Sequence, residues 1–287
     1  MAHDLQLLSP QKEFSLKRKS IEYRKSIIKL IYLSKAGHTG GSLSCVDILN
    51  VLYNQVMNIS PNNVSAIDRD HYIHSKGHSV EALYAVLMDL GFFSEDQMST
   101  FEKYNSPFIG HPTRSVPGIE QNTGALGHGL SFSVGMALAA KLDGRNNRIF
   151  TIMGDGELTE GSIWEASASA AHYHLDNLVT IIDRNNLQIS GKTEEVMNME
   201  PIHDKFSAFG FAVRQVDGND IPELVSVFSE LPFKSGKPNL LIAHTIKGKG
   251  ISFMEDNVAW HHRVPTDSEF SIAMQELEQA ELSLERQ

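Results

Sequence analysis

Cysteine and long apolar runs are both scarce in this sequence, and each absence excludes a class of protein. Cys45 is the single cysteine among 287 residues, so no disulfide can form within the chain. The N-terminal segment MAHDLQLLSPQKEFSLKRKS lacks an apolar stretch of signal-peptide length. No run approaches the roughly 18 apolar residues that a membrane helix needs. We therefore expect a soluble protein of a reducing compartment, the cytoplasm.

Basic residues are also in the minority, with 25 Lys and Arg against 35 Asp and Glu and a net charge of −10. Binding to a phosphate backbone needs a basic face, so a general affinity for nucleic acid is not expected. The hydrophobic fraction of 41% is enough for a large core. Neither a Pro/Gly/Ser-rich linker nor an internal repeat interrupts the chain, and we predict one domain over residues 1–287.

Apolar strands alternate with helices along the sequence, which predicts an α/β fold with a mainly parallel sheet covered by helices on both faces. Residues 92–128 are expected to be rich in loops. The predicted strands are 71–74, 148–153, 178–183, 211–216 and 239–245, and the predicted helices are 12–35, 45–57, 80–90, 130–142, 162–174, 221–231 and 267–282. In such sheets, ligands bind beyond the carboxyl ends of the strands.

Two polar residues stand at such strand ends. Asp155, between two glycines, follows the strand 148–153, and Asn185 follows the strand 178–183. If these strands are neighbours, the two side chains converge and offer oxygen ligands of the kind that Mg²⁺ prefers. The flanking glycines let the backbone approach a ligand, and the helix after Gly161 would direct its N-terminus toward an anion. Each turn alone is common, but the combination predicts a site for Mg²⁺ and a diphosphate.

A glycine-rich loop and several histidines add to this pattern. Residues 124–129 precede a predicted helix, where backbone N–H groups can bind phosphate. Histidines in glycine-flanked loops can bind a ligand and transfer protons near neutral pH, although a structural hydrogen bond is the alternative for any one of them. Their spacing does not suggest zinc. These histidines are His38, His78, His111, His261 and His262.

In this order, the motifs resemble the N-terminal half of transketolases. The matching segments are 37–42, 75–79, 110–112, 124–129, 154–161, 185–189 and His261, and the resemblance extends over about residues 20–265. The chain is most similar to split transketolases, in which the domains that bind the diphosphate and the pyrimidine of thiamine diphosphate (ThDP) are separate polypeptides.

The resemblance implies a role for each matched residue. Asp155, Asn185 and the backbone carbonyl of Leu187 would bind Mg²⁺, for which Ca²⁺ or Mn²⁺ could substitute. Glu160 would meet the activating glutamate of the partner subunit. The residues implied in catalysis are His38, His78, His111, His261 and Glu160, and those implied in binding ThDP are His78, Gly124, Leu126, Gly156, Glu160, Asn185, Ile189 and His261.

The sequence departs from one-chain transketolases at three points. Ala125 and His128 replace the usual Pro and Gln of the glycine loop. His262 follows His261 where the one-chain form has Gly, which leaves the functional histidine open between the two; we prefer His261. The chain ends at Gln287 without a pyrimidine domain. We therefore expect a partner subunit that contains this domain, an α₂β₂ assembly, and no activity of the chain alone.

The implied reaction transfers a two-carbon ketol unit from a ketose, such as a sugar phosphate of pentose phosphate metabolism, to an aldose. Four alternatives stay open from the sequence. They are a split transketolase specialised for a branched or sulfonated sugar, the α chain of a 2-oxo-acid dehydrogenase, a fragment of a deoxyxylulose-phosphate synthase, and a non-catalytic paralogue. The histidine loops favour a polyhydroxylated sugar over a 2-oxo acid.

Overall fold

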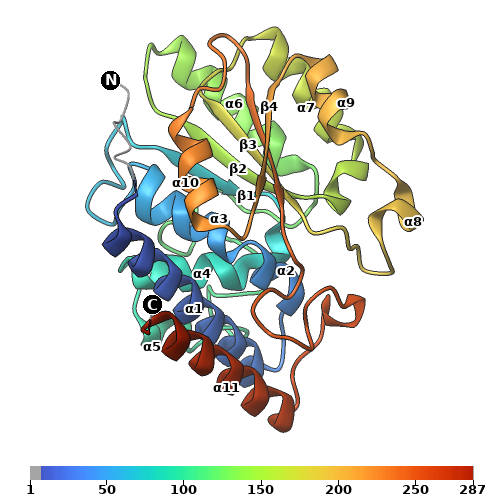
Figure 1. Cartoon of the computed structure of the whole chain (residues 1–287). Helices are drawn as coiled ribbons and strands as arrows, with labels where there is room; N and C mark the ends of the chain where they lie inside the picture. The colour runs from blue at the N-terminus through green and yellow to red at the C-terminus, as the bar shows by residue number, and fades with distance from the viewer. Residues whose placement is uncertain (1–7, 287) are drawn as a thin grey trace.

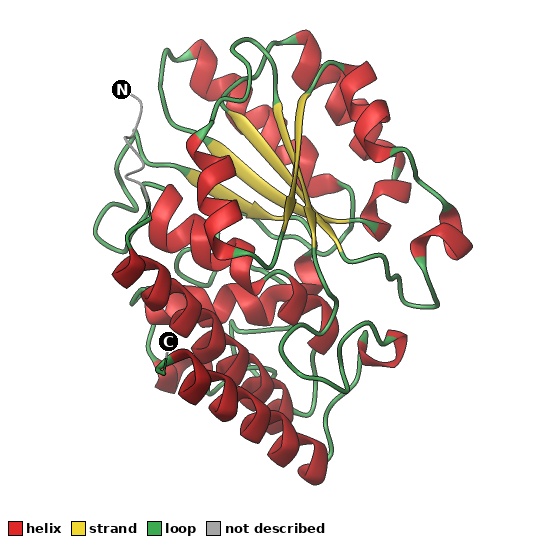
Figure 2. Ribbon diagram, viewed as in Figure 1, coloured by secondary structure: helices red, strands yellow, loops and turns green. Residues whose placement is uncertain are grey.

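Five parallel strands form one sheet in the order β1-β2-β3-β5-β4 in the computed structural model, which describes residues 8–286 (Figures 1 and 2). Every neighbouring pair of strands is parallel, so all their carboxyl ends lie along one edge. The strands are β1 (His71–His74), β2 (Ile149–Gly154), β3 (Leu178–Arg184), β4 (Ala212–Asp217) and β5 (Asn239–His244).

The sheet is covered on both faces, as the apolar strand sequences predict. All residues of β3 are buried. Along β2, Phe150 and Ile152 pack into one core cluster, while Ile149 and Met153 pack into the other. This alternation follows from the two-residue period of a strand, which sends successive side chains to opposite faces.

Helices on opposite faces enclose the sheet (Figure 1). One cluster contains residues of α6 (His128–Leu142), α7 (Gly161–His172) and α9 (Ile202–Phe209). The other contains residues of α1 (Pro10–Ser34), α3 (Val46–Val51), α4 (Val80–Asp89) and α10 (Ile221–Ser229). The short elements are α2 (Thr39–Ser44), α5 (Glu95–Met98), α8 (Thr193–Met197), the π-helical turn η1 (Leu52–Val56) and the 3₁₀ turns η2 (Gly77–Ser79), η3 (Gly156–Thr159) and η4 (Val258–Trp260).

The last helix, α11 (Asp267–Leu284), lies along α1 rather than on the sheet (Figure 1). It begins with a capping box between Thr266 and Glu269, which satisfies backbone N–H groups at its first turn. Lys25 of α1 pairs with Glu281 of α11 at 2.5 Å. Ala273 and Leu277 of α11 join the same core cluster as the buried residues of α1, so α11 extends that cluster away from the sheet.

All five predicted strands are confirmed to within one or two residues at each end, and the predicted parallel α/β fold is confirmed with them. The predicted helix 45–57 is confirmed as a continuous helical stretch, in which α3 passes directly into the π-helical turn η1. The chain bends just before it, at Cys45, which has φ −93° and ψ 4°. The separate helix α2 was not expected, and neither were α8 and α9. Among the described residues, no helix is both long and apolar enough to span a membrane.

Candidate active site

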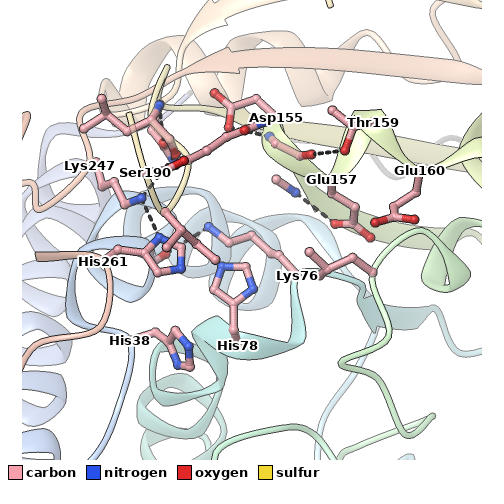
Figure 3. A pocket seen from close by; sticks show the side chains of 18 of the residues that line it. His38, Lys76, His78, Asp155, Glu157, Thr159, Glu160, Ser190, Lys247 and His261 are labelled. Carbon is pink, nitrogen blue, oxygen red and sulfur yellow. Dashed lines mark hydrogen bonds between the residues drawn. The ribbon is translucent and has the colours of Figure 1, made fainter. Parts of the chain in front are cut away.

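The carboxyl ends of β2 and β3 lie side by side, because Gly154 pairs with Asp183 in the sheet register. Helix α7 makes the crossover between the two strands. Asp155 and Asn185 follow the strand ends and, together with Leu187, line a cavity of about 400 Å³ (Figure 3). The strand order thus brings together the oxygen atoms that the sequence pattern singled out.

Nearly all residues predicted for the site line this one cavity. His111 is the exception, and its ring centroid lies 6.2 Å from that of His38, which does line the cavity. The predicted residues along the wall are His38, His78, Gly124, Leu126, Asp155, Gly156, Glu160, Asn185, Leu187, Ile189 and His261.

Asp155 is buried and held by its neighbours. One carboxylate oxygen accepts a hydrogen bond from the Gly156 backbone N–H at 2.8 Å, and the other accepts from the Asn186 N–H at 2.6 Å and from Arg184 Nη1 at 3.1 Å. Burial raises the pKa of Asp155, the Asp183 carboxylate raises it further, and Arg184 opposes both. A divalent cation would favour the ionised form of this carboxyl group.

The donor atoms at this end suit Mg²⁺. The Asn185 amide nitrogen points to Asp183 Oδ2 at 3.4 Å, so its Oδ1 is the end left for a cation, although it also accepts from the Leu187 N–H at 3.2 Å. Among residues 8–286 there is no group of three or more His, Cys, Asp or Glu side chains that could hold a metal. One carboxylate, one amide and one carbonyl would instead leave positions for phosphate and water oxygens, which is how Mg²⁺ is usually bound.

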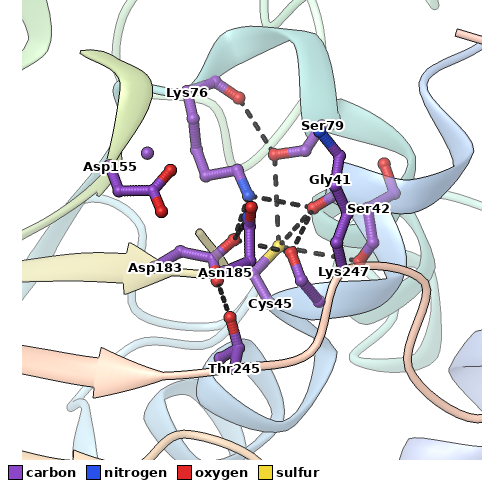
Figure 4. Close-up of polar contacts among 12 residues, drawn as sticks. Gly41, Ser42, Cys45, Lys76, Ser79, Asp155, Asp183, Asn185, Thr245 and Lys247 are labelled. Carbon is purple, nitrogen blue, oxygen red and sulfur yellow. Dashed lines mark hydrogen bonds and ion pairs between the residues drawn. The ribbon is translucent and has the colours of Figure 1, made fainter. Parts of the chain in front are cut away.

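Behind these residues lies a buried ion pair between Lys76 and Asp183 (Figure 4). Asp183 also accepts hydrogen bonds from Ser44 Oγ at 2.6 Å and from the Thr245 hydroxyl, and Lys76 donates to the Gly41 carbonyl at 2.9 Å. Burial acts to raise the pKa of Asp183, but the Lys76 ammonium outweighs it and the pKa is lowered overall. We call Lys76, Asp155, Asp183 and Asn185 the strand-end cluster.

Lys247 connects this cluster with the histidines and was missed by the sequence reasoning. Its Nζ lies 3.1 Å from the Leu187 carbonyl oxygen and 2.8 Å from His261 Nδ1. Burial, together with the Lys76 ammonium, lowers the pKa of Lys247 to about 8. The Lys-Gly-Lys-Gly sequence after β5 was the available signal, because a parallel strand ends there as well.

Glu157 was missed too, although it directly follows the Gly-Asp-Gly motif. Its carboxylate accepts hydrogen bonds from the Ser75 hydroxyl, from the Gly127 N–H at 2.8 Å and from the Gly154 N–H at 3.1 Å. These three donors come from three different loops at the cavity. Glu157 therefore ties together the loops that carry His78, the glycine-rich segment and Asp155.

At the other end of the cavity, four imidazole rings gather around that of His38, and we call these five rings the histidine cluster. The ring centroid of His38 lies 5.3 Å from His78, 5.6 Å from His261 and 4.5 Å from His262. His261 lines the cavity, whereas His262 is exposed and does not. The Nδ1 atom of His38 is buried and finds no hydrogen-bond partner within residues 8–286.

The members of this cluster that line the cavity have low basicity. Burial, together with the nearby His262 and His111, lowers the pKa of His38 to about 4. Burial likewise lowers the pKa of His261 to about 3, together with the Lys247 ammonium, and holds the pKa of His78 well below its ordinary value. These rings are therefore neutral near pH 7, when each can donate one hydrogen bond and accept another.

The glycine-rich loop needs its glycines for close packing. Gly124 has φ +137°, and a Cβ there would lie 2.7 Å from His111 Cδ2. Gly127 has φ +84°, and a Cβ there would lie 2.6 Å from Glu160 Cβ. A side chain at either position would be strained by its backbone conformation and would displace a predicted site residue.

Two predicted residues lie at the open mouth of the cavity. Ile189 is 72% exposed, which is unusual for a large apolar side chain beside a polar cavity, and Glu160 is exposed as well. The carboxylate of Glu160 makes no ion pair within the described residues. An apolar side chain and an unpaired carboxylate thus face outward together at the rim of the site.

Known proteins are similar to this chain in both sequence and fold. Residues 19–277 match the family described as "Transketolase, thiamine diphosphate binding domain". The chain is 46% identical over 273 residues to an apulose-4-phosphate transketolase subunit of Phocaeicola vulgatus, an alignment that covers 95% of this chain and 97% of that protein. It is 39% identical over 269 residues to the 6-deoxy-6-sulfo-D-fructose transketolase subunit SqwG of a Clostridium species, with 93% and 98% covered.

Solved structures give the same fold. The transketolase of Campylobacter jejuni superposes with a TM-score of 0.81 at 29% identity, covering 94% of this chain and 48% of that one. The chain thus spans about half the length of this solved protein and almost the whole length of the two subunits.

Proposed function

This chain belongs to the transketolase family, and we propose that it is the cofactor-binding subunit of a two-chain transketolase that moves a two-carbon ketol unit from a ketose to an aldose. The family match identifies a ThDP-binding domain. Relatives of similar length are named as subunits, which supports a split enzyme. We take residues 1–287 as a single domain of this kind.

One observation supports the proposal most directly. The oxygens of Asp155, Asn185 and Leu187 line the same cavity as three neutral histidines, His38, His78 and His261. A metal-chelated diphosphate would bind at the end with the oxygen donors, and the hydroxyl groups of a sugar would bind at the end with the histidines. The separation of the two ends is set by the sheet edge and by α2, which are both regular elements.

Asp155, Asn185 and the Leu187 carbonyl would hold Mg²⁺ (or Ca²⁺ or Mn²⁺), and the metal would neutralise the diphosphate of ThDP. Gly156, Gly124 and Leu126 would lie along the cofactor, with Ile189 at its apolar face. Lys247, which already contacts the Leu187 carbonyl and His261, would add a positive charge near the diphosphate. Bound ThDP would supply the carbon nucleophile and electron sink of ketol transfer.

The chain's own residues would handle the substrate. His38, His78, His111 and His261 would bind the hydroxyl groups of the sugar and exchange protons with them, which neutral imidazoles can do by accepting at one nitrogen and donating at the other. The unpartnered Nδ1 of His38 is the atom most in need of such a group, because a buried polar atom without a hydrogen bond costs about 1–3 kcal/mol.

A partner subunit would complete the site. Glu160 and Ile189 are exposed at the mouth, where a pyrimidine-binding domain of a second chain would cover them and bring the activating glutamate to Glu160. We propose an α₂β₂ assembly with a site at each interface between unlike chains. The lone Cys45 is buried as a free thiol, in keeping with a cytoplasmic location.

The substrate we favour is a ketose with an anionic far end. The first donors to assay are apulose 4-phosphate and 6-deoxy-6-sulfo-D-fructose, because the relatives at 46% and 39% identity are named for them. A sugar phosphate of pentose phosphate metabolism is the comparison substrate. The residues that bind the phosphate or sulfonate of the sugar would belong to the partner subunit. The cavity of this chain would bind the ketol end, which all three donors have in common.

Two measurements test the proposal. Isothermal titration calorimetry of the isolated chain with ThDP is expected to show binding that requires Mg²⁺ and is lost on chelation. A coupled assay with sugar phosphates is expected to show no ketol transfer by the isolated chain and transfer once a pyrimidine-domain subunit is added. Turnover without a partner would refute the two-chain proposal, and absence of Mg²⁺-dependent ThDP binding would refute the cofactor site.

A further inference from the structure

Helix α4 contacts the loops that carry all three N-terminal histidines of the cluster. His78 lies in η2, immediately before α4 begins at Val80. One turn further along, Tyr84 donates from its hydroxyl to the Ile109 carbonyl at 3.1 Å and the His111 carbonyl at 3.4 Å. Between them, Glu81 reaches the loop that carries His38. The helix is thus a common support for segments that are far apart in sequence.

Glu81 is fully buried, and a buried carboxyl group needs hydrogen-bond donors to be stable in its charged form. Its Oε1 accepts a hydrogen bond from the backbone N–H of His38 at 3.0 Å, and its Oε2 accepts from Ser42 Oγ at 2.7 Å. These two donors stand at the start and the middle of α2, so the carboxylate is joined to this short helix at two points.

Gly37 makes this contact possible. A Cβ at position 37 would lie 2.5 Å from Glu81 Oε1, which is closer than real Cβ contacts come, and the residue has φ +143°. Only glycine allows the chain to pass the carboxylate at this distance without strain. The absence of a side chain at Gly37 therefore lets the backbone before His38 turn closely around the Glu81 carboxylate.

The ring of His38 has little else to fix it. Its Nδ1 atom is buried without a hydrogen-bond partner among the described residues. Its place at the centre of the histidine cluster is therefore set by its backbone and by ring packing. The His38 backbone has two polar contacts: its carbonyl accepts from the Ser42 N–H at 3.1 Å, at the start of α2, and its N–H donates to Glu81. Glu81 is therefore the contact that joins this backbone to α4.

We propose that Glu81 is a positioning residue that fixes His38 for substrate binding through the His38 N–H and the Ser42 hydroxyl. This inference rests on the proposed function, because it assigns Glu81 a part in the binding of the ketose. Glu81 does not line the cavity, so it would act through His38 and would not touch the cofactor.

The arrangement would also respond to pH. Burial raises the pKa of Glu81 to about 7, while the hydrogen bonds from Ser42 and His38 oppose the rise. The ionisable groups that face Glu81 are His38 from the α2 loop, Tyr84 from α4 and Glu102 from the loop after α5, and Glu102 adds to the rise. The strength of the hydrogen bond from the His38 N–H should therefore change near neutral pH, where the Glu81 carboxyl group changes its charge.

The first test uses the isolated chain and NMR. In the wild type, the chemical shift of the His38 amide should titrate with a midpoint near pH 7. In Glu81→Gln the amide oxygen can still accept from His38 and the amide nitrogen can donate to Ser42, so the structure should persist without this titration. In Glu81→Leu both donors lose their acceptor, and hydrogen exchange of the His38 amide should speed up at least about tenfold.

The second test uses the complete enzyme with its partner subunit. Glu81→Leu should raise the KM for the ketose donor about tenfold, and Glu81→Gln should restore it to within about twofold of wild type. The Kd for ThDP should stay within about twofold in both variants. Ser42→Ala removes one of the two hydrogen bonds to Glu81 and should give a smaller rise in the donor KM. This variant replaces Glu81→Leu in the test if Glu81→Leu does not fold. Glu278→Gln, at an exposed carboxyl group on α11, serves as the control.

Two results would overturn the inference. One is a His38 amide whose exchange rate and pH titration are unchanged in Glu81→Leu, or in Ser42→Ala if only that variant folds. The other is a donor KM that changes no more in these variants than in Glu278→Gln. Failure of the proposed function would look different, because the wild-type chain would then not bind ThDP while the NMR test of Glu81 could still succeed.

Discussion

At the strand ends, Asp183 accepts hydrogen bonds from Lys76, Ser44 and Thr245, whereas at the opposite end of the cavity the buried Nδ1 of His38 has no partner among residues 8–286. Asp183 is thus charged and saturated with hydrogen bonds, whereas the cavity-lining rings of the histidine cluster are neutral and that of His38 has an unpaired nitrogen. A charged, saturated group is costly to disturb, so it suits a cofactor that stays bound. Neutral groups with free hydrogen-bonding positions suit a substrate that enters and leaves.

The largest effect is expected when a charge is removed from the strand-end cluster. Lys76→Met leaves Asp183 buried without its cation and should lower the free energy of unfolding by about 3–5 kcal/mol. The matched control is Lys29→Met, which removes a pair with Glu95 that is more than half exposed and should cost no more than about 1 kcal/mol. Urea denaturation measures both. Equal losses in the two variants would show that the buried pair is not a special feature of the site.

The second test concerns the cofactor. Asp155→Asn keeps the shape of the side chain but removes its charge, so Mg²⁺-dependent ThDP binding should weaken at least about 100-fold. Glu165→Gln changes an exposed carboxyl group on α7, outside the cavity lining, and should alter the Kd no more than about threefold in the isolated chain. Calorimetry with ThDP and Mg²⁺ distinguishes them. If both variants bound equally, the metal site would have to be elsewhere.

The third test separates the two ends directly. His38→Gln should reduce ketol transfer by the assembled enzyme roughly 30-fold, because it removes a hydrogen-bonding and proton-transfer group at the substrate end. The Kd for ThDP should change by no more than about twofold, since the strand-end cluster is untouched. Steady-state kinetics and calorimetry on one preparation give both values. A parallel loss of cofactor binding would contradict the division of the cavity into two ends.

A smaller effect is expected in the pH dependence of stability. Burial lowers the pKa of His38 to about 4 and of His261 to about 3, whereas an unfolded imidazole titrates near about 6.5. Both rings therefore gain protons on unfolding below pH about 6.5, and the stability present above that pH is lost as the pH falls toward about 4. The double variant His38→Gln, His261→Gln should show a shallower loss, by up to about two protons in slope.

Thermal or urea unfolding at a series of pH values measures that slope. Substituting the exposed His203 and His128 by Gln gives the matched control, since neither ring belongs to the histidine cluster. The two double variants should diverge only below pH about 6.5. Identical curves would mean that the cluster is protonated in the folded protein.

The smallest effect concerns the pair at positions 261 and 262. His262 is exposed and outside the cavity lining, so His262→Gly should change the donor KM by no more than about twofold. His261→Gly removes a ring that lines the cavity and contacts Lys247, and it should reduce activity clearly more. Kinetics of the two variants side by side decide between the histidines. A larger effect at position 262 would reverse our preference.

Most of the fold could be predicted because it depends on local patterns. The five strands stand out as short apolar runs, and Asp155 and Asn185 stand out because they follow two of them. The helix over 45–57 was also predicted from its apolar period, but the short helix α2 before it was missed, and the chain bends at Cys45 between the two. That bend allows α2 to pack against η2 and α4, a long-range contact that no local period reveals.

The sequence alone determined which residue types reach the edge of the sheet: glycines beside oxygen donors, and histidines in loops. It could not determine which charges would be paired or which imidazoles would be neutral. Lys76 and Asp183 are 107 positions apart, and Glu81 is 43 positions from His38, so their contacts exist only after folding. Protonation follows the same rule, because the free energy of a charge depends on its burial and its neighbours, and both are properties of the packed structure.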